Sequence, residues 1–326
     1  MKKTTFKHCK ILLAAALLIG GSQAIAQQAW PSKPIRLIVP FAPGGATDQV
    51  ARLMGTKLTA QLGVTVLVEN KPGANGNIGA DYVAKAAPDG YTVLHSTSSL
   101  AFTAAFRQKV SYDLAKDLAP VSLVINQPLL IMASNQSGIT NVQTLRDYAR
   151  KNAGKLSYAS SGTGNLTHLA MFVALRALEL DATHVPYKGG AGAFPDFIAG
   201  RTDLFADPIN SAYPYVRDGR VTAIAVTGAQ RSALAPNVPT VSESILPGFS
   251  MGAWQALMAP AGTPPAIINK LSAAYSVALK DPEVKAKLAA QGAEPIGSTP
   301  EAFKSFIDAE VRRWEKVVDS SGIRLD

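Results

Sequence analysis

The stretch "IRLIVPFAPGGATDQVARLM", residues 35–54, decides the fold of this chain. Ile35–Val39 is almost continuously apolar, which is typical of a parallel strand buried on both faces. The chain then turns through a Pro-Gly-Gly segment that ends at Gly45, and apolar residues resume at helical spacing from Val50. A strand, a glycine turn and a helix in this order predict an α/β architecture with parallel pairing.

The turn at Gly44 and Gly45 also suits an anionic ligand. Glycine lets a ligand approach the backbone closely, and the first turn of the next helix exposes unpaired N–H groups with a partial positive charge. Thr47 or Asp48 can cap that helix. The segment matches neither a P-loop nor a dinucleotide-binding loop. A plain strand-to-helix connection explains it equally well.

A second segment, "SSGTGN" at 160–165, repeats the design in the middle of the chain. If the two loops face each other, two helix N-termini converge on one cleft, which suits a solute that carries carboxylate groups. The hydroxyl and backbone N–H donors of this segment come from Ser160, Ser161, Gly162, Thr163 and Gly164.

Strands and helices alternate along the rest of the chain, which favours an α/β fold whose ligand lies outside the carboxyl ends of the strands. The predicted strands are 64–68, 91–94, 121–125, 129–133, 156–159, 183–185, 203–206, Val221–Val226 and 252–258. The predicted helices are 78–86, Val142–Lys151, one after the "SSGTGN" segment, one from about Pro264, and a last one that opens at 298–301.

The N-terminal segment 1–26 predicts a cleavable export signal. Four lysines precede a short apolar run at 11–19, and Ala24, Ile25 and Ala26 form a small-residue cleavage pattern. We therefore expect a mature periplasmic chain from Gln27 that contains no further membrane span. The only cysteine, Cys9, lies inside this leader, so the mature chain is expected to have no disulfide.

The charge of the chain does not indicate a nucleic-acid partner. The formal net charge is +9, and about four of these charges belong to the leader. A nucleic-acid surface needs clustered cations interleaved with aromatic residues, which this sequence lacks. A mildly positive, solvated surface is the simpler interpretation, and it can draw in anionic solutes.

The sequence offers little support for catalysis or metal binding. It contains no Ser-x-x-Lys or His-Glu-x-x-His pattern, and His95, His168 and His184 are far apart. We therefore expect no catalytic residues, no cofactor and no metal, with the histidines in packing or hydrogen-bonding roles. A hydrolase-like periplasmic enzyme remains the least favoured alternative.

Ordered motifs over nearly the whole mature chain resemble the substrate-binding proteins of tripartite tricarboxylate transporters, also called the Bug family. The resemblance rests on "WPSKPIRLIVPFAPGGATDQVAR", "VENKPGANGNIGADYVAKAAPDGYTVL", "YASSGTGNLTHLA", "VPYKGGAGAFPDFIAGRTDLFAD", "PTVSE" and "WQALMAPAGTP".

The resemblance implies a two-lobed periplasmic binding protein of type II-like fold, with mixed, mostly parallel sheets, helices on both faces and a ligand cleft between the lobes. One lobe would combine 27–126 with 250–326, and the other would be 127–249. The chain would cross between them near 124–130 and near 249–254.

The resemblance also implies which loops contact the ligand. Asp48 is expected to brace its loop rather than meet an anion. Asp207 either accepts a hydrogen bond from an amino, hydroxyl or protonated group of the ligand or caps a turn. The expected ligand-binding residues are Phe41, Ala42, Gly44, Gly45, Thr47, Gly76, Asn77, Ser96, Thr97, Ser160, Ser161, Gly162, Thr163, Gly164, Asn165, Tyr187, Lys188, Gly189, Gly190 and Asp207.

Two residues depart from the pattern of the family. Asn75 stands where a glycine is common, and Asn165 stands where serine is frequent. Both lie near the expected cleft and can change which solute fits. His95 also lies near it, and its imidazole either contacts a carboxylate of the ligand or packs in the core.

The function implied is a monomeric periplasmic receptor, not an enzyme. It would capture a small di- or tricarboxylate, amino-acid-like or aromatic carboxylate and deliver it to the integral membrane permease subunits of the transporter. A solute sensor that signals to a membrane partner without transport is the alternative from another class.

Overall fold

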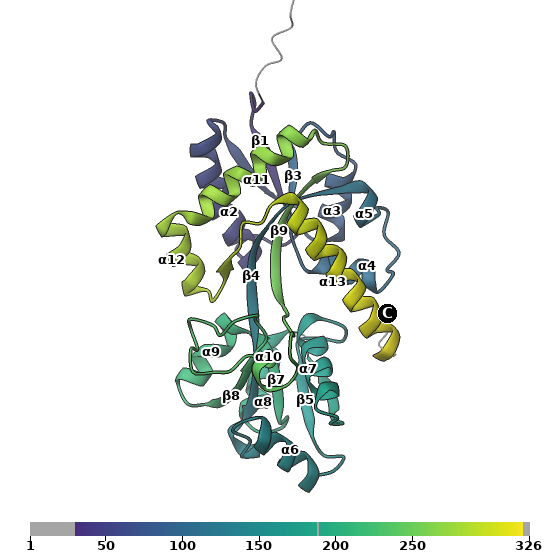
Figure 1. The fold of residues 1–326 in the computed structure, drawn as a ribbon, viewed down its shortest axis with the longest axis vertical. Helices are drawn as coiled ribbons and strands as arrows, with labels where there is room; N and C mark the ends of the chain where they lie inside the picture. Colours follow the sequence, from purple (N-terminus) through teal and green to yellow (C-terminus); the bar gives the residue numbers. More distant parts are fainter. Residues whose placement is uncertain (1–29, 188, 322–326) are drawn as a thin grey trace, which may run out of the picture.

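The computed structural model describes residues 30–187 and 189–321. The predicted leader and Lys188 lie outside the described residues. Figure 1 shows an elongated molecule in two parts, with strands β4 (Leu118–Ser134) and β9 (Gly252–Pro260) running between them. Within the described residues, no helix is both long and apolar enough to cross a membrane.

The first part is built on a sheet in the order β2-β1-β3-β9-β4, and a short strand β10 also pairs with β4. Its strands are β1 (Ile35–Val39), β2 (Val66–Asn70), β3 (Thr92–Thr97), β9, the first half of β4, and β10 (Glu294–Pro295). Its helices are α2 (Ala46–Leu62), α3 (Asn77–Ala84), α4 (Ser99–Ala105), α5 (Leu114–Asp117), α11 (Pro265–Lys280), α12 (Pro282–Ala290) and α13 (Pro300–Ser321), with a 3-10 turn at Ala74–Gly76.

The second part continues the sheet from the last residues of β4 through β7, β5 and β6, with β8 on the other side of β4. Its strands are β5 (Ser157–Ser160), β6 (Thr183–Pro186), β7 (Leu204–Pro208) and β8 (Val221–Val226). Its helices are α6 (Val142–Lys151), α7 (Leu166–Ala177), α8 (Gly190–Ile198), α9 (Ile209–Arg217) and α10 (Val241–Ser244), with a 3-10 turn at Asn135–Ser137.

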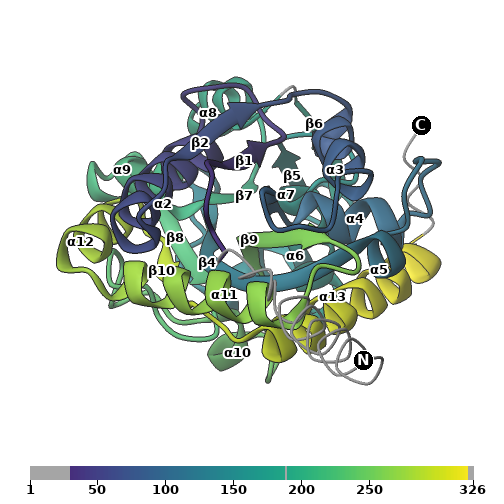
Figure 2. The ribbon, with the colours of Figure 1, turned by 90° about the horizontal axis from the view of Figure 1, so that it is seen from above.

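Helices cover both faces of each sheet. Alternate residues along a strand point to opposite faces, so each strand contributes to two cores. In β1, Leu37 and Val39 pack with α2 and α11, whereas Ile38 packs on the α3, α4 and α13 side. Figure 2 shows these two groups of helices flanking the first sheet. In β4, Leu129 and Ile131 face a core that also contains Phe102 of α4 and Trp314 of α13, while Leu130 and Met132 face a core of the second part.

The sheets are mixed, as expected, but parallel pairing does not predominate. The parallel ladders join β1 to β2 and β3, and β5 to β6 and β7. Every ladder described for β4 and β9 is antiparallel. The reason is the path of the chain, since β9 returns alongside β4 and must run in the opposite direction.

The two strands predicted around the "NQP" segment are one strand. Pro128 reads as a break because it lacks an N–H donor. In the structure β4 passes through Pro128, which lies opposite Gly252 in β9. A Cβ at Gly252 would lie 2.2 Å from Asn126 Oδ1 and 2.8 Å from Gln127 O, so the close approach of the two strands here requires glycine.

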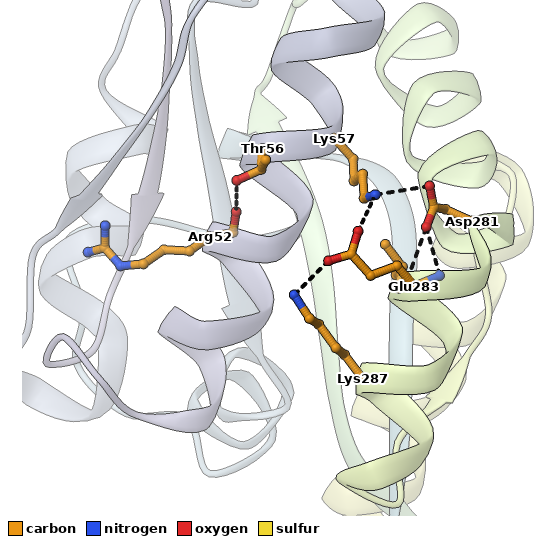
Figure 3. A network of polar contacts seen from close by, with 7 residues as sticks. Arg52, Thr56, Lys57, Asp281, Glu283 and Lys287 are labelled. Carbon is orange, nitrogen blue, oxygen red and sulfur yellow. Dashed lines mark hydrogen bonds and ion pairs between the residues drawn. The ribbon is translucent and has the colours of Figure 1, made fainter.

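An ionic network holds α2, which begins at the first glycine turn, against α12. Lys57 Nζ lies 3.0 Å from Asp281 Oδ2 and 2.8 Å from Glu283 Oε2, and Lys287 Nζ donates to Glu283 Oε1 (Figure 3). Solvent screens these ion pairs, so the network orients α2 more than it stabilises the fold.

Candidate functional site

A cavity of about 780 Å³ lies between loops of the first part and loops of the second part. Ten of the predicted ligand-binding residues line it. They are Phe41, Thr47, Thr97, Ser161, Gly162, Thr163, Gly164, Asn165, Gly190 and Asp207.

Other predicted residues do not line this cavity in the structure, and Lys188 lies outside the described residues. Several of them are close to a lining residue in the sequence, as Gly44 and Gly45 are to Thr47. This second group comprises Ala42, Gly44, Gly45, Gly76, Asn77, Ser96, Ser160, Tyr187 and Gly189.

The sequence did not single out several lining residues. Asn75 was noticed only as a departure from the family pattern. Ser98, Ser99 and Pro208 stand at or just after the ends of strands but were not chosen as ligand-binding residues. The others carry no glycine or strand-end signal of their own; they are Phe102, Gln108, Leu166, Thr167, Ala191, Ser211 and Ala253.

Asp48 braces the first loop, as the sequence predicted. Its carboxylate is buried and accepts hydrogen bonds from Gly44 N at 2.9 Å, Arg52 Nε at 2.9 Å and Asn70 Nδ2 at 2.8 Å. Asn70 Nδ2 also donates to Phe41 O. Burial opposes the charge of Asp48, but the hydrogen bonds from Arg52, Gly44 and Asn70 outweigh it and hold the pKa below its usual value.

The N-terminus of α2 is left without a side-chain cap. Gly45 is its N-cap residue and makes no side-chain cap bond, while Gly44 before it adopts φ +83°. The helix therefore begins with backbone N–H groups that no N-cap side chain satisfies, and its partial positive charge favours an anion.

The loop before α3 runs through four consecutive residues with positive φ, from Gly73 to Gly76. Asn75 has φ +53°, a conformation that Asn tolerates better than most non-glycine residues. Gly76 packs so closely that a Cβ would lie 3.3 Å from both Phe41 and Ser99. Because of this packing, the loop holds Asn75 at the wall of the cavity.

Strand β3 ends beside the cavity with hydroxyl groups. Thr97 Oγ1 donates to Ser99 Oγ at 3.0 Å, and both residues line the cavity. Ser96 is fully buried, and its hydroxyl has no hydrogen-bond partner among the described residues.

His95 packs in the core rather than at the cavity. Its side chain is fully buried, and Nε2 lies 2.8 Å from Gln255 Oε1. Burial lowers the pKa of His95 to about 4, although the bond to Gln255 acts in the opposite direction. The imidazole therefore stays neutral at physiological pH and is not placed to meet a ligand in this conformation.

The "SSGTGN" loop differs from the first loop because much of its donor capacity is used internally. Asn165 caps α7 and accepts from the N–H groups of Thr167 at 3.0 Å and His168 at 3.1 Å. Ser161 N donates to Thr167 Oγ1, and Gly164 N donates to His168 Nδ1. The two glycine loops were expected to present two equivalent helix N-termini, and the structure shows that only the first of them lacks a side-chain cap. The N-terminus of α8, whose N-cap is Gly189, lacks a side-chain cap as that of α2 does.

Two stacked histidines support this loop. The rings of His168 and His184 lie 3.8 Å apart at 7°, and Tyr158 stacks on His184 at 5.0 Å. His184 Nε2 lies 2.6 Å from Ser160 Oγ, which explains why Ser160 is turned away from the cavity. Burial, and then the neighbouring His184, lower the pKa of His168 to about 4.

Asp207 lies at the end of β7 and lines the cavity, although only 4% of it is exposed. Ser161 Oγ donates to its Oδ1 at 3.2 Å, and Ser211 Oγ donates to its Oδ2. Burial raises the pKa of Asp207 to about 6, and the two hydroxyl groups only partly oppose this. Ser211 lies in the first turn of α9, so the carboxylate also joins the end of β7 to that helix.

The walls of the cavity can bind a polar anion but contain no cation among the described residues. Their polar groups are hydroxyls, side-chain amides and one carboxyl, and they include those of Thr47, Thr97, Ser161, Asn75, Gln108 and Asp207. A separate cavity of about 600 Å³ lies between α4 and α13, and none of the predicted site residues lines it.

Known proteins resemble this chain in sequence and in fold. The sequence profile described as "Tripartite tricarboxylate transporter family receptor" matches residues 50–323. BugT of Bordetella pertussis (strain Tohama I) is 34% identical over 308 residues, which are 94% of this chain and 94% of BugT.

Solved structures share both sequence and fold with this chain. A Rhodopseudomonas palustris protein reported with adipate is 34% identical, with a TM-score of 0.74, over 90% of this chain and 99% of that one. MatC from the same organism, reported with bound malate, is 35% identical, with a TM-score of 0.70, over 89% and 100%. The fold is therefore that of the periplasmic binding proteins.

Proposed function

Because this chain belongs to the receptor family of the tripartite tricarboxylate transporters, we propose that it captures a small carboxylated metabolite and delivers it to a transporter of that type. Relatives solved with adipate and with malate support a carboxylate as the ligand. The observation that carries the proposal is the cavity of about 780 Å³ whose walls come from both parts of the molecule.

A carboxylate can bind here without a buried cation. A hydrogen bond to a charged group contributes ~1.5–3 kcal/mol, and a helix N-terminus contributes ~0.3–1 kcal/mol. Micromolar affinity requires about 8 kcal/mol. We propose that the uncapped start of α2, the hydroxyl group of Thr47 and the side-chain amides of Asn75 and Gln108 supply these bonds.

We further propose that the two parts are lobes that close over the ligand, with residues 27–126 and 250–326 in one and 127–249 in the other. The change of pairing partner within β4 supports this division, since Pro128 pairs with β9 and Leu129 pairs with β7. Closure would compact the molecule and bury the ligand between the loops. Solution scattering with and without ligand would show a smaller radius of gyration on binding, and an unchanged radius would contradict closure.

We propose that the protein is exported to the periplasm through the N-terminal leader, is monomeric and docks on integral permease subunits. We also propose that the bound solute leaves unchanged, because the described histidines are packed in the protein rather than presented at the cavity. Turnover of a bound solute, lost on substitution of Asp207 or Lys188, would instead establish an enzyme.

Isothermal titration of ligand-stripped protein against a panel of organic acids tests the central claim. Mass spectrometry of the ligand retained through purification would name the solute directly. We expect one or a few carboxylates to bind at micromolar or tighter affinity. If no acid of the panel binds and no carboxylate is retained, the proposed function is wrong. Solute uptake by a strain that lacks this protein separates transport from sensing. Loss of a transport receptor would abolish uptake, whereas loss of a sensor would leave uptake by an expressed permease unchanged.

A further inference from the structure

A second cavity, of about 600 Å³, lies entirely in the first part of the molecule, between α4, α5 and α13 (Figure 1). Its volume is in the range of small-molecule sites. Among the described residues, Gln108 is the one that lines both this cavity and the cavity between the two parts. The second cavity therefore has its own walls, and the proposed function does not use it.

The floor of this second cavity is apolar. Thr103 and Tyr112 also line it, but their hydroxyls donate to Asn77 Oδ1, at 3.1 Å and 2.8 Å, and Asn77 is not a lining residue. A hydrocarbon chain or ring that covers this floor removes apolar area from water, which favours binding. The buried apolar residues of the floor are Leu100, Leu118, Met258 and Ile307.

The rim of the second cavity is positively charged. Four cations and two carboxylates line the cavity, which leaves an excess of two positive charges, and all four cations are exposed at its mouth. The cavity between the two parts has the opposite balance, since its described walls hold one carboxylate and no Lys, Arg or His. The cations of the rim are Arg107, Lys109, Lys304 and Arg312, and the carboxylates are Asp113 and Asp308.

The ion pairs at the rim leave two of the cations available. Both carboxylates are already paired, Asp113 with Lys116 at 2.8 Å and Asp308 with Lys304 at 2.9 Å. Arg107 pairs with Asp319 of α13. For Lys109 and Arg312, no hydrogen bond or ion pair to another residue of 30–187 or 189–321 is described.

Exposed cations alone are ordinary solvated surface, and so is a shallow apolar patch. Here both border one cavity, and this combination selects the ligand. A small polar anion would leave the apolar floor uncovered, and a neutral hydrocarbon would leave the two unpaired cations without a partner. An apolar chain or ring that ends in one carboxylate satisfies both parts of the cavity.

We propose that this cavity is a second binding site, for a monocarboxylate with an apolar chain or ring. The chain covers the floor, and the carboxylate lies at the rim, where Lys109 and Arg312 attract it. Every lining residue belongs to the first part of the molecule, so this site depends neither on closure of the two parts nor on the proposed function.

Octanoate and decanoate are the probes that test the proposal. NMR of protein labelled at the methionine methyl groups reports on the site, because Met258 lines this cavity and no described methionine lines the cavity between the parts. Met258→Leu assigns the signal. We expect both acids to shift the Met258 signal until the site is saturated. Decanoate should bind ~10-fold more tightly than octanoate, since each added methylene on an apolar floor contributes ~3- to 4-fold.

A pair of double variants tests the role of charge. Lys109→Gln with Arg312→Gln removes the two unpaired cations and should weaken octanoate binding ~5- to 30-fold. Lys280→Gln with Lys285→Gln removes the same charge from exposed positions of α11 and α12 that do not line the cavity, and should leave the affinity unchanged. All four positions are exposed, so circular dichroism should show the original fold.

Ala115→Trp tests the location of the bound acid. Ala115 is exposed and lines the cavity, so an indole ring there should block its mouth and weaken octanoate binding at least ~10-fold. Undiminished binding in this variant, a Met258 signal that neither acid shifts, or equal effects of the two double variants would overturn the proposal. None of these results bears on the cavity between the two parts.

Discussion

His168 and His184 stack face to face, with ring centroids 3.8 Å apart and planes 7° apart. Each ring also holds the "SSGTGN" loop, through Gly164 N to His168 Nδ1 and through Ser160 Oγ to His184 Nε2. Two positive rings could not stack at this distance, and a protonated Nδ1 could not accept from Gly164. The shape of this cavity wall therefore depends on neutral histidines.

The first prediction concerns acid stability. The pKa of His95 and that of His168 are each lowered to about 4 by burial, so the unfolded chain binds protons that the folded protein does not. The contribution of the neutral histidines to the free energy of unfolding is fully present above about pH 6.5 and is lost as the pH falls towards 4. Each group contributes on the order of 3 kcal/mol to this loss.

Asp207 acts in the opposite direction, because its raised pKa makes the folded state bind a proton between about pH 6 and 4. Two histidines outweigh one carboxyl, so we expect a net loss on the order of 3 kcal/mol between pH 7 and pH 4. Urea denaturation at several pH values measures this. Constant stability over the range would show that the histidines are not held neutral by the fold.

The second prediction concerns Asp207→Asn in the absence of ligand. The folded protein must ionise a buried carboxyl at pH 7, and the amide removes that cost, so stability should rise by up to about 3 kcal/mol. The gain should shrink as the pH falls to 5, because Asp207 is then increasingly protonated. Thermal denaturation beside Asp218→Asn, which changes an exposed carboxylate at the end of α9, measures it. A loss of stability at pH 7 would contradict the expectation.

The third prediction concerns Gly45→Val at the start of α2. Gly45 has φ −73°, and a Cβ there would make only an ordinary contact, 3.7 Å from Ala42 O. The fold should therefore tolerate valine at a cost of about 1 kcal/mol for a poor N-cap residue. The branched side chain would block approach to the helix N-terminus, and affinity for the carboxylate should fall at least ~100-fold, about 2.8 kcal/mol.

Gly45→Ala gives an intermediate step in the same titration, because it adds one methyl group and should weaken binding less than valine. Unchanged affinity in the valine variant, with the fold intact by circular dichroism, would mean that the loop is only a connection.

The fourth prediction uses Asn75→Gly. Asn75 has φ +53°, so glycine should preserve the backbone and leave stability unchanged or slightly higher. The amide at the cavity wall is lost, and the affinity ratio between ligands of different length should change by ~3- to 30-fold. Ala74→Gly is the matched control, because Ala74 also has positive φ, +46°, but does not line this cavity. Equal effects of the two substitutions would assign the change to the backbone.

Much of the fold could be predicted where local signals and packing agree. Strand β8 and helix α6 have the predicted bounds, since β8 is a buried apolar run and α6 begins at the N-cap Asn141. Helices α8 and α9 were not predicted, because Pro195 and Pro214 lie inside them and read as breaks. Packing of their apolar residues against β7 and β8 outweighs that cost.

The site was predictable at the ends of strands and less so elsewhere. The bracing role of Asp48 was expected from the resemblance to the family, and the structure shows it. The inward turn of Ser160 depends on His184, which is 24 residues away along the chain, so no local pattern could reveal it. Ser211 and Gln108 reach the cavity from a helix and a loop that the sequence did not mark.

The apolar cluster that joins the two parts of the molecule has a consequence for unfolding. Phe102 of α4 and Trp314 of α13 lie in the same buried cluster as Leu129 and Ile131 of β4, and their rings meet at 5.1 Å. Melting either sheet would expose this cluster and remove a partner strand from the other sheet. The calorimetric and van't Hoff enthalpies of the whole chain should consequently coincide, as for a single cooperative unit.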